Sequence, residues 1–257
     1  MTSPYSTLRL EIEDGIAEIH LARPDLLNRF DMPAHKEFAA ALRTVRDKGA
    51  AVRVLILAAD GRAFSAGGDF DEILEAHAQA AVRDEMVTYA REVFYGIAGL
   101  EIPVIAAVQG AAIGLGATIA TLCDIVVAWR EAKIADTHVN VGIVAGDGGI
   151  VSWSQSIGVN RAKRYLLTGD IMTGEKAYQY GLVTELVELP ANALPRAREL
   201  AGKIRAMAPM GVNGTKRAFA RITAARAAEA FEFGLAQEME SIAAPELPAL
   251  IDALRKR

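Results

Sequence analysis

A glycine-rich turn, Gln109-Gly110-Ala111-Ala112-Ile113-Gly114-Leu115-Gly116, directly follows the apolar run at residues 104–108. The run predicts a buried strand, because strands of a parallel sheet are covered on both faces. The turn leads into a short helix expected at residues 115–122, and a further strand is expected at residues 125–128. N–H groups at a helix start lack intrahelical partners, and small residues let a ligand approach the backbone. We therefore expect a buried strand–turn–helix unit that offers backbone donors to a ligand.

The uncharged segment at residues 102–123 also has the length of a membrane-spanning helix, for which about 20 apolar residues are enough. Pro103 and the glycines of the turn interrupt it, and Asp124 follows directly. We therefore expect no membrane span. Residues 1–14 show no apolar segment behind a basic start, so we expect no secretory signal and a cytoplasmic location.

Another turn of the same kind, Ala63-Phe64-Ser65-Ala66-Gly67-Gly68-Asp69, lies nearer the N-terminus. We call this turn, at residues 63–69, the first glycine-rich turn and the one at residues 109–116 the second. A strand is expected before it, at residues 52–58, and a helix after it, at residues 69–78. Periodicity and capping residues predict further elements: a hairpin at 8–13 and 15–21, and helices at 33–45, 82–100, 150–157, 162–167 and 174–181.

Strand patterns end near Pro195, and helical patterns rich in Ala, Arg and Glu follow. We therefore expect a mixed α/β body at residues 1–195 and a C-terminal helical region at residues 196–257. The helical region is too short to bury a large core of its own, so it should pack on the body or on a neighbouring subunit.

Composition excludes several classes of protein. The 257 residues are 52% hydrophobic, which suits a sizeable core and excludes general disorder. The formal net charge is −4, whereas a nucleic-acid-binding protein usually has a basic excess. The single cysteine, Cys123, excludes an internal disulfide and a cysteine-based zinc site, and its apolar surroundings predict a buried structural thiol.

The two turns, in this order and at this spacing, resemble the enoyl-CoA hydratase/isomerase (crotonase) superfamily. The resemblance begins at the hairpin and continues through Asp25-Leu26-Leu27-Asn28, Cys123-Asp124 and Tyr180-Gly181-Leu182-Val183 to Lys216. It implies an α/β fold, a spiral of ββα units with a C-terminal helical region that builds homotrimers, often paired into hexamers. It also implies an acyl-CoA substrate, with no cofactor or metal besides the coenzyme A of that substrate.

In that superfamily two backbone N–H groups form an oxyanion hole for the thioester carbonyl. The resemblance assigns them to Gly68 and Leu115, and preorganised donors of this kind stabilise an enolate or a tetrahedral oxyanion. It assigns substrate binding to the neighbouring turn residues Leu27, Ala66, Gly67, Asp69, Gly114 and Thr118.

The acid and base groups depart from the pattern of the hydratases, which add water with two glutamates. Thr118 stands at the first of these positions and His138 at the second. His138 and Asp147 have the spacing of the β-diketone hydrolase branch, typified by 6-oxocamphor hydrolase, and His35 and Glu238 match further residues of that branch. That branch lacks the oxyanion turns that this chain keeps.

A histidine near its ordinary pKa of about 6.5 exchanges protons at neutral pH. We therefore expect His138 to act as the base and Asp147 to orient it. Plainer interpretations stand beside these: a structural histidine at 138, a turn-forming aspartate at 147, and solvent-exposed side chains at His35 and Glu238.

The resulting hypothesis is an enzyme that stabilises the enolate of an acyl-CoA for hydration, isomerisation or C–C cleavage. Two alternatives stay open: a β-diketone hydrolase that needs no coenzyme A, and a catalytically degenerate CoA-binding protein. The sequence does not specify the acyl chain.

Overall fold

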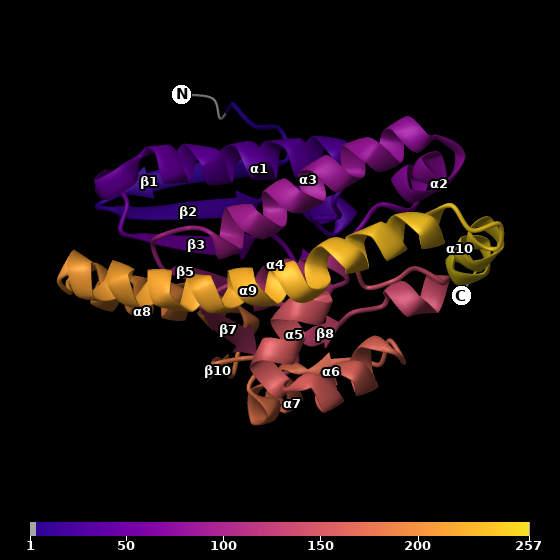
Figure 1. Ribbon diagram of the computed structural model, residues 1–257. Coiled ribbons are helices and arrows are strands. Elements are labelled where there is room, and N and C mark those ends of the chain that lie inside the picture. Colours follow the sequence, from indigo (N-terminus) through magenta and orange to yellow (C-terminus); the bar gives the residue numbers. More distant parts are fainter. Residues whose placement is uncertain (1–3, 257) are drawn as a thin grey trace.

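A six-stranded sheet forms one layer of the structure, a computed structural model that describes residues 4–256 (Figure 1). Its strand order is β1-β2-β3-β5-β7-β10. The first two strands form the expected antiparallel hairpin, with Leu8 opposite Leu21, and the others are parallel. The strands are β1 (Leu8–Glu13), β2 (Ile16–Leu21), β3 (Val54–Ala59), β5 (Val104–Val108), β7 (Ile125–Trp129) and β10 (Glu185–Val187).

A smaller four-stranded sheet, in the order β4-β6-β8-β9, accompanies the large one. The chain passes from β3 to β4, from β5 to β6 and from β7 to β8, so each of these large-sheet strands is followed by a small-sheet strand. This repeat is the expected spiral of ββα units. The small strands are β4 (Ala63–Ser65), β6 (Ala111–Ile113), β8 (Lys133–Ala135) and β9 (Met172–Thr173).

Helices of the body lie close to the expected ranges. Asp31 caps the first of them, because its carboxylate accepts the Ala34 N–H. The helices are α1 (Met32–Asp47), α2 (Phe70–Ala78), α3 (Ala80–Ala98), α4 (Leu115–Thr121), α5 (Gly149–Ile157), α6 (Val159–Leu166) and α7 (Gly174–Tyr180). Short 3-10 turns occur at Pro24–Leu26, Gly49–Ala51, His138–Val141 and Pro190–Asn192.

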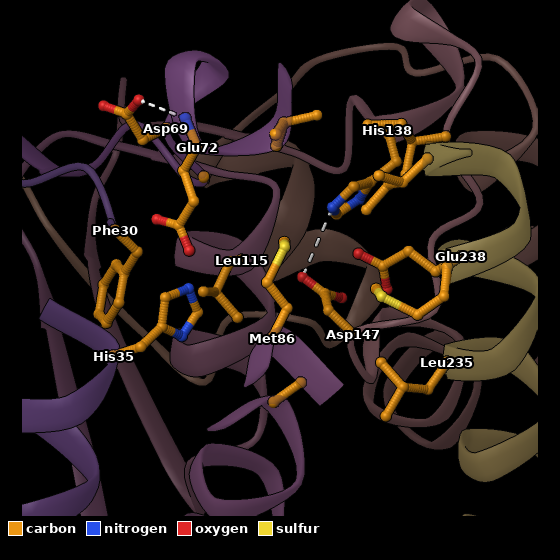
Figure 2. Close-up of a pocket in the computed structure, with 16 residues that line it drawn as sticks. Phe30, His35, Asp69, Glu72, Met86, Leu115, His138, Asp147, Leu235 and Glu238 are labelled. Carbon is orange, nitrogen blue, oxygen red and sulfur yellow. Dashed lines mark hydrogen bonds and ion pairs between the residues drawn. The ribbon is translucent and has the colours of Figure 1, made fainter. Parts of the chain in front are cut away.

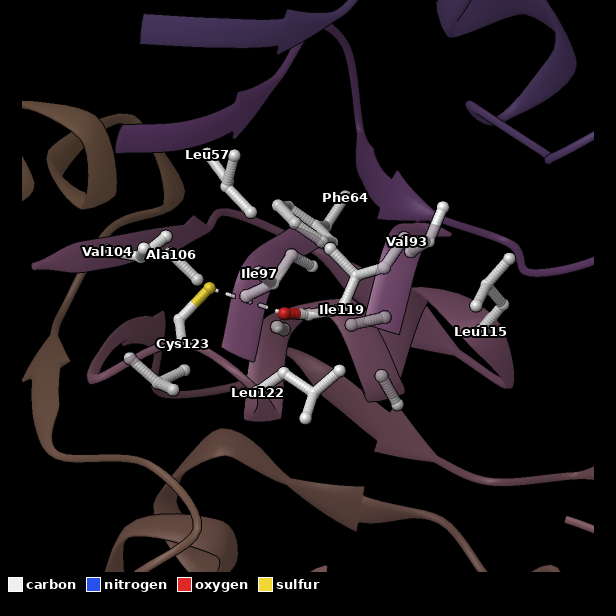
Figure 3. Packing of buried hydrophobic residues seen from close by; sticks show 14 of the residues in the cluster. Leu57, Phe64, Val93, Ile97, Val104, Ala106, Leu115, Ile119, Leu122 and Cys123 are labelled. Atoms are coloured by element: carbon white, nitrogen blue, oxygen red, sulfur yellow. Dashed lines mark hydrogen bonds between the residues drawn. The ribbon is translucent and has the colours of Figure 1, made fainter. Parts of the chain in front are cut away.

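The uncharged segment of the sequence lies in the core as β5, β6 and α4 (Figure 3). Cys123 is buried there, and its thiol donates to the Ile119 carbonyl at 3.3 Å, which agrees with a structural role. Across residues 4–256, none of the helices combines the length and apolar character that crossing a membrane requires.

The C-terminal region consists of α8 (Ala193–Arg205), α9 (Pro209–Ile242) and α10 (Leu247–Arg255). Ala193, Ala197 and Ala201 of α8 pack on the large sheet. The long helix α9 runs across the body (Figure 1), where Phe231 stacks on Phe94 of α3 with ring centroids 4.0 Å apart. The region thus packs on the body of its own chain, and a division at residue 195 stays a prediction.

Candidate active site

The first glycine-rich turn is held in a short parallel ladder. The Phe30 N–H donates to the Gly67 carbonyl, and the Asp69 N–H donates to the Phe30 carbonyl, both at 2.8 Å. In this register Phe30 forms its hydrogen bonds with Gly67 and Asp69, the residues on either side of Gly68. The Gly68 N–H is therefore not used in the pairing of the two segments.

The second turn packs directly against the first. Gly67 has φ +88°, and a Cβ there would lie 2.6 Å from the Ile113 carbonyl oxygen. Gly114 has φ 52° and ψ −123°, a conformation that only glycine adopts readily, and it precedes Leu115, the first residue of α4. The Leu115 N–H therefore has no acceptor within its own helix. Within residues 4–256 neither the Gly68 nor the Leu115 N–H is used in a hydrogen bond.

Both donors line a small cavity of about 50 Å³ (Figure 2). Seven residues singled out from the sequence line it: His35, Gly68, Asp69, Leu115, His138, Asp147 and Glu238. Most of the remaining wall consists of apolar side chains: Phe30, Ile73, Met86, Ala90, Ile143, Leu235, Met239 and Ile242. The sequence patterns thus converge on one site, although the apolar wall was not predicted.

His138 is oriented by a different carboxylate from the one expected. Its Nδ1–H donates to Asp136 Oδ1 at 2.6 Å, while Nε2 lies 3.7 Å from Asp147 Oδ2. The physical reason is local: Asp136 precedes the 3-10 turn that begins at His138, so its carboxylate reaches the nearer ring nitrogen. Asp136 is therefore the orienting residue, and Asp147 faces the opposite nitrogen.

Surrounding carboxylates determine the charge of His138. Burial by itself would lower the pKa of this imidazole, but the negative charges of Asp136 and Asp147 raise it well above 6.5. These carboxylates therefore favour the charged form of His138 over the free base. Its ring lies beside the second turn, since a Cβ on Gly114 would be 3.6 Å from His138 Cε1.

Asp147 is held in place from behind by Thr118. The Thr118 hydroxyl donates to Asp147 Oδ1 at 2.8 Å, and the Gly149 N–H reaches the same oxygen at 3.3 Å. Burial raises the pKa of Asp147, and the charge of His138 opposes this rise. Thr118 itself does not line the cavity as described, so its visible contact is with Asp147.

Glu238 reaches the site from α9 although it is distant in sequence. It is buried, contrary to the exposed interpretation, and a Cβ on Gly146 would lie only 2.8 Å from Glu238 Cβ. Burial, reinforced by the charges of Asp147 and Asp136, raises the pKa of Glu238 to about 8. We call Asp136, His138, Asp147 and Glu238 the acid–base cluster.

His35 and Glu72 lie across the cavity from this cluster (Figure 2). His35 is buried, also contrary to the exposed interpretation, and packs edge-on against Phe30 at a centroid distance of 5.3 Å. Burial lowers the pKa of His35 to about 4, and burial raises that of Glu72 to about 7. Glu72 was not predicted from the sequence, because an acidic residue early in a helix usually faces solvent.

The remaining expected binding residues support the turns. The Ala66 N–H donates to the Leu27 carbonyl at 2.9 Å, while Gly67 and Gly114 form the contact between the two turns. Leu27 and Ala66 are not part of the described cavity wall, and their role in substrate binding stays a prediction. Lys216 is buried and paired with Asp124 at 2.7 Å.

A metal ion is the other chemistry that this group of side chains suggests. Asp136, His138 and Asp147 each have a ligand atom within 4.8 Å of the others. However, the two ring nitrogens face two different carboxylates, so one ion could not replace both contacts. His138 already lies between the two carboxylates as their shared counter-ion, and we assign no metal to the three side chains.

Comparison with known proteins gives consistent matches. A family model described as enoyl-CoA hydratase/isomerase matches residues 11–243. The chain is 31% identical to a crotonyl-CoA hydratase from Syntrophomonas wolfei over 214 residues, which are 83% of this chain and 81% of that protein.

Solved structures agree with this match. An enoyl-CoA hydratase/isomerase from Mycobacterium paratuberculosis is similar with a TM-score of 0.92 and 32% identity, covering 97% of this chain and 99% of that one. A β-diketone hydrolase from the cyanobacterium Anabaena, bound to (S)-3-oxocyclohexyl acetic acid, gives a TM-score of 0.83 and 26% identity, covering 93% and 95%.

Proposed function

Because the chain belongs to the enoyl-CoA hydratase/isomerase family, we propose that it binds an acyl-CoA thioester and stabilises its enolate. The observation that carries this proposal is the pair of unused N–H groups, at Gly68 and Leu115, on the wall of one cavity. Two such donors stabilise the negative charge that develops on the thioester oxygen, and loss of one typically costs about 3–4 kcal/mol in the transition state.

We assign to Asp147 the removal of a proton from C2, the acyl carbon next to the thioester carbonyl. Asp147 Oδ2 accepts no hydrogen bond from the described residues. Burial raises the pKa of Asp147, which makes its carboxylate a stronger base. His138, as an imidazolium beside the second turn, adds positive charge near the developing oxyanion. This revises the expected division of roles, in which His138 was the base.

Isomerisation of a 3-enoyl-CoA to a 2-enoyl-CoA is the net reaction that these groups support best. Asp147 takes a proton from C2, the electron pair delocalises onto the thioester oxygen, and protonated Glu238 delivers a proton to C4. The proton on Asp147 then passes to Glu238, which returns both side chains to their starting protonation states. Water addition is less well supported, because Thr118 and His138 occupy the positions of the two hydratase glutamates.

Hydrolytic cleavage of a β-diketone is the second candidate. The observation that favours it is the acid–base cluster, with His138, Asp147 and Glu238 at positions matching that branch, together with the likeness to the Anabaena hydrolase. This reaction would need no coenzyme A.

Product analysis separates the candidates. The protein is incubated with but-3-enoyl-CoA, crotonyl-CoA and a cyclic 1,3-diketone, and products are identified by mass spectrometry. We expect conversion of but-3-enoyl-CoA to crotonyl-CoA, with little 3-hydroxybutanoyl-CoA. Cleavage of the diketone without turnover of either thioester would instead support the hydrolase, and binding of thioesters without turnover would support a degenerate protein.

A further inference from the structure

Two polar side chains line the cavity away from the acid–base cluster. Glu72 comes from α2 and His35 from α1, and Figure 2 shows them on the left of the view, with His138, Asp147 and Glu238 of the cluster farther right. Leu115, which carries one oxyanion donor, lies between the two groups in this view. The proposed proton transfer uses neither Glu72 nor His35.

Their polar atoms lack well-formed hydrogen bonds. Both carboxylate oxygens of Glu72 and Nδ1 of His35 are buried, and none has a hydrogen-bond partner of good geometry among residues 4–256. The backbone N–H of Met32 is close enough to Glu72 to lower the pKa of its carboxyl group, but it does not complete a hydrogen bond. A buried polar atom left unpaired costs about 1–3 kcal/mol. Lys216, a buried charged side chain outside the cavity, is by contrast paired, since its ammonium group donates to Asp124. At Glu72 and His35 the unpaired atoms belong to the wall of a cavity, where a bound molecule would supply the missing partners.

The charges around Glu72 restrict what that molecule can be. Burial and the acidic neighbours Asp31, Asp69 and Glu75 raise the pKa of Glu72 to about 7, and burial lowers that of His35 to about 4. Near neutral pH, His35 is therefore uncharged and Glu72 is neutral or negative. A carboxylate on the ligand would be repelled, and a plain alkyl group would leave the polar atoms unpaired. A hydroxyl or carbonyl group would satisfy them without a charge.

We propose that Glu72 and His35 form a subsite for a neutral hydrogen-bonding group, a hydroxyl or a carbonyl, at the far end of a short acyl chain. The inference rests on the proposed acyl-CoA function and adds the substrate class to it: a hydroxy- or oxo-substituted acyl thioester in place of a simple fatty acyl one. The small volume of the cavity is the reason for a short chain.

Three thioesters test the subsite: 5-hydroxypent-3-enoyl-CoA, hex-3-enoyl-CoA and hex-3-enedioyl-CoA. Their chains carry a hydroxyl, a methyl and a carboxylate at the same distance from the thioester. The measured quantity is kcat/KM for exchange of the C2 proton in D2O. We expect the value for the hydroxyl compound to exceed that for the methyl compound by about 10–100-fold, and the carboxylate compound to give the lowest value.

Two variants of Glu72 separate its hydrogen bonding from its charge. Glu72→Leu should bring the hydroxyl-to-methyl ratio close to 1, mainly by improving exchange of the methyl compound. Glu72→Gln keeps hydrogen bonding and removes the charge, so it should retain the hydroxyl preference and improve exchange of the carboxylate compound about tenfold. Glu131→Gln, at an exposed position outside the cavity wall, is the matched control and should leave all three values unchanged.

An unchanged hydroxyl-to-methyl ratio in Glu72→Leu overturns the subsite and leaves the proposed function standing. If Glu72→Leu does not fold, Glu72→Gln provides the test. A kcat/KM for the carboxylate compound equal to that of the native protein would then overturn the subsite. Absence of C2 exchange with all three thioesters overturns the proposed function and the subsite together.

Discussion

His138 has a carboxylate at each ring nitrogen, Asp136 at 2.6 Å and Asp147 at 3.7 Å. We predict that it stays an imidazolium at pH 7.5, visible in the ¹⁵N chemical shifts of its ring. Asp136→Asn should lower the pKa of His138 because it removes one of the negative charges that raise it, whereas Asp170→Asn on the surface should not change it. Because the folded-state pKa is raised, the stability from this group is complete below pH ~6.5 and is lost as pH rises through the folded-state pKa. A neutral His138 ring at pH 7 would contradict the assignment.

Glu72 gives a second prediction, on stability. Its pKa is about 7 in the folded protein against an ordinary 4.5, so its ionisation opposes folding increasingly between these two pH values. Glu72→Gln should therefore raise Tm relative to the native protein more at pH 8 than at pH 5. Thermal unfolding at both pH values, with Glu131→Gln at an exposed position as control, measures this difference. The same increase in Tm at both pH values would show that ionisation of Glu72 does not destabilise the folded protein.

Individual residues were predictable from sequence where a turn fixes their place, as for Gly68 and Leu115. Asp136 was missed, although it lies only two residues before His138, because the 3-10 turn that joins them has no strong sequence signal. Glu72 was missed because its burial depends on packing between α1, α2 and the cavity, and no local pattern reports such packing.

At the scale of elements, the first turn carries a third prediction. Gly68→Pro removes the N–H and should reduce C2 exchange about a hundredfold or more. Gly68→Ala keeps the N–H, and a Cβ at this position meets only Ile73 Cδ1, at 3.5 Å, so this control should retain nearly full activity. Circular dichroism must show both variants folded. Equal activity of the two would remove the Gly68 N–H from the reaction.

The regular elements followed from sequence because their apolar periodicity is long enough to recognise. Strands β5 and β7 and helices α1 and α3 belong to this group. Strands β4, β6, β8 and β9 were not predicted, because two or three residues have no periodicity and pair only once their neighbours are in place. These short strands nevertheless build the small sheet from which both glycine-rich turns emerge.

At the scale of the whole molecule, one surface remains incompletely covered. Phe219 and Ile222, on one face of α9, are 61% and 54% exposed, and with Val159 they line an open cleft beside α5. Exposed apolar clusters of this kind mark interaction surfaces. We predict that native protein is a homotrimer, or a hexamer of two trimers, by light scattering. A double variant, Phe219→Asp with Ile222→Asp, should give a smaller species, and a native monomer would contradict the prediction.

The site itself depends on the whole chain, since its donors, its acid–base cluster and its far wall come from segments that meet only in the folded protein. The claim common to all of them is that the cavity enolises an acyl-CoA. The most direct measurement is deuterium incorporation at C2 of but-3-enoyl-CoA in D2O, followed by mass spectrometry. We predict rapid incorporation with native protein and a loss of about 10²–10⁴-fold in Asp147→Asn, with thioester affinity retained. No incorporation with the native protein, or equal incorporation with folded Asp147→Asn, would contradict the account.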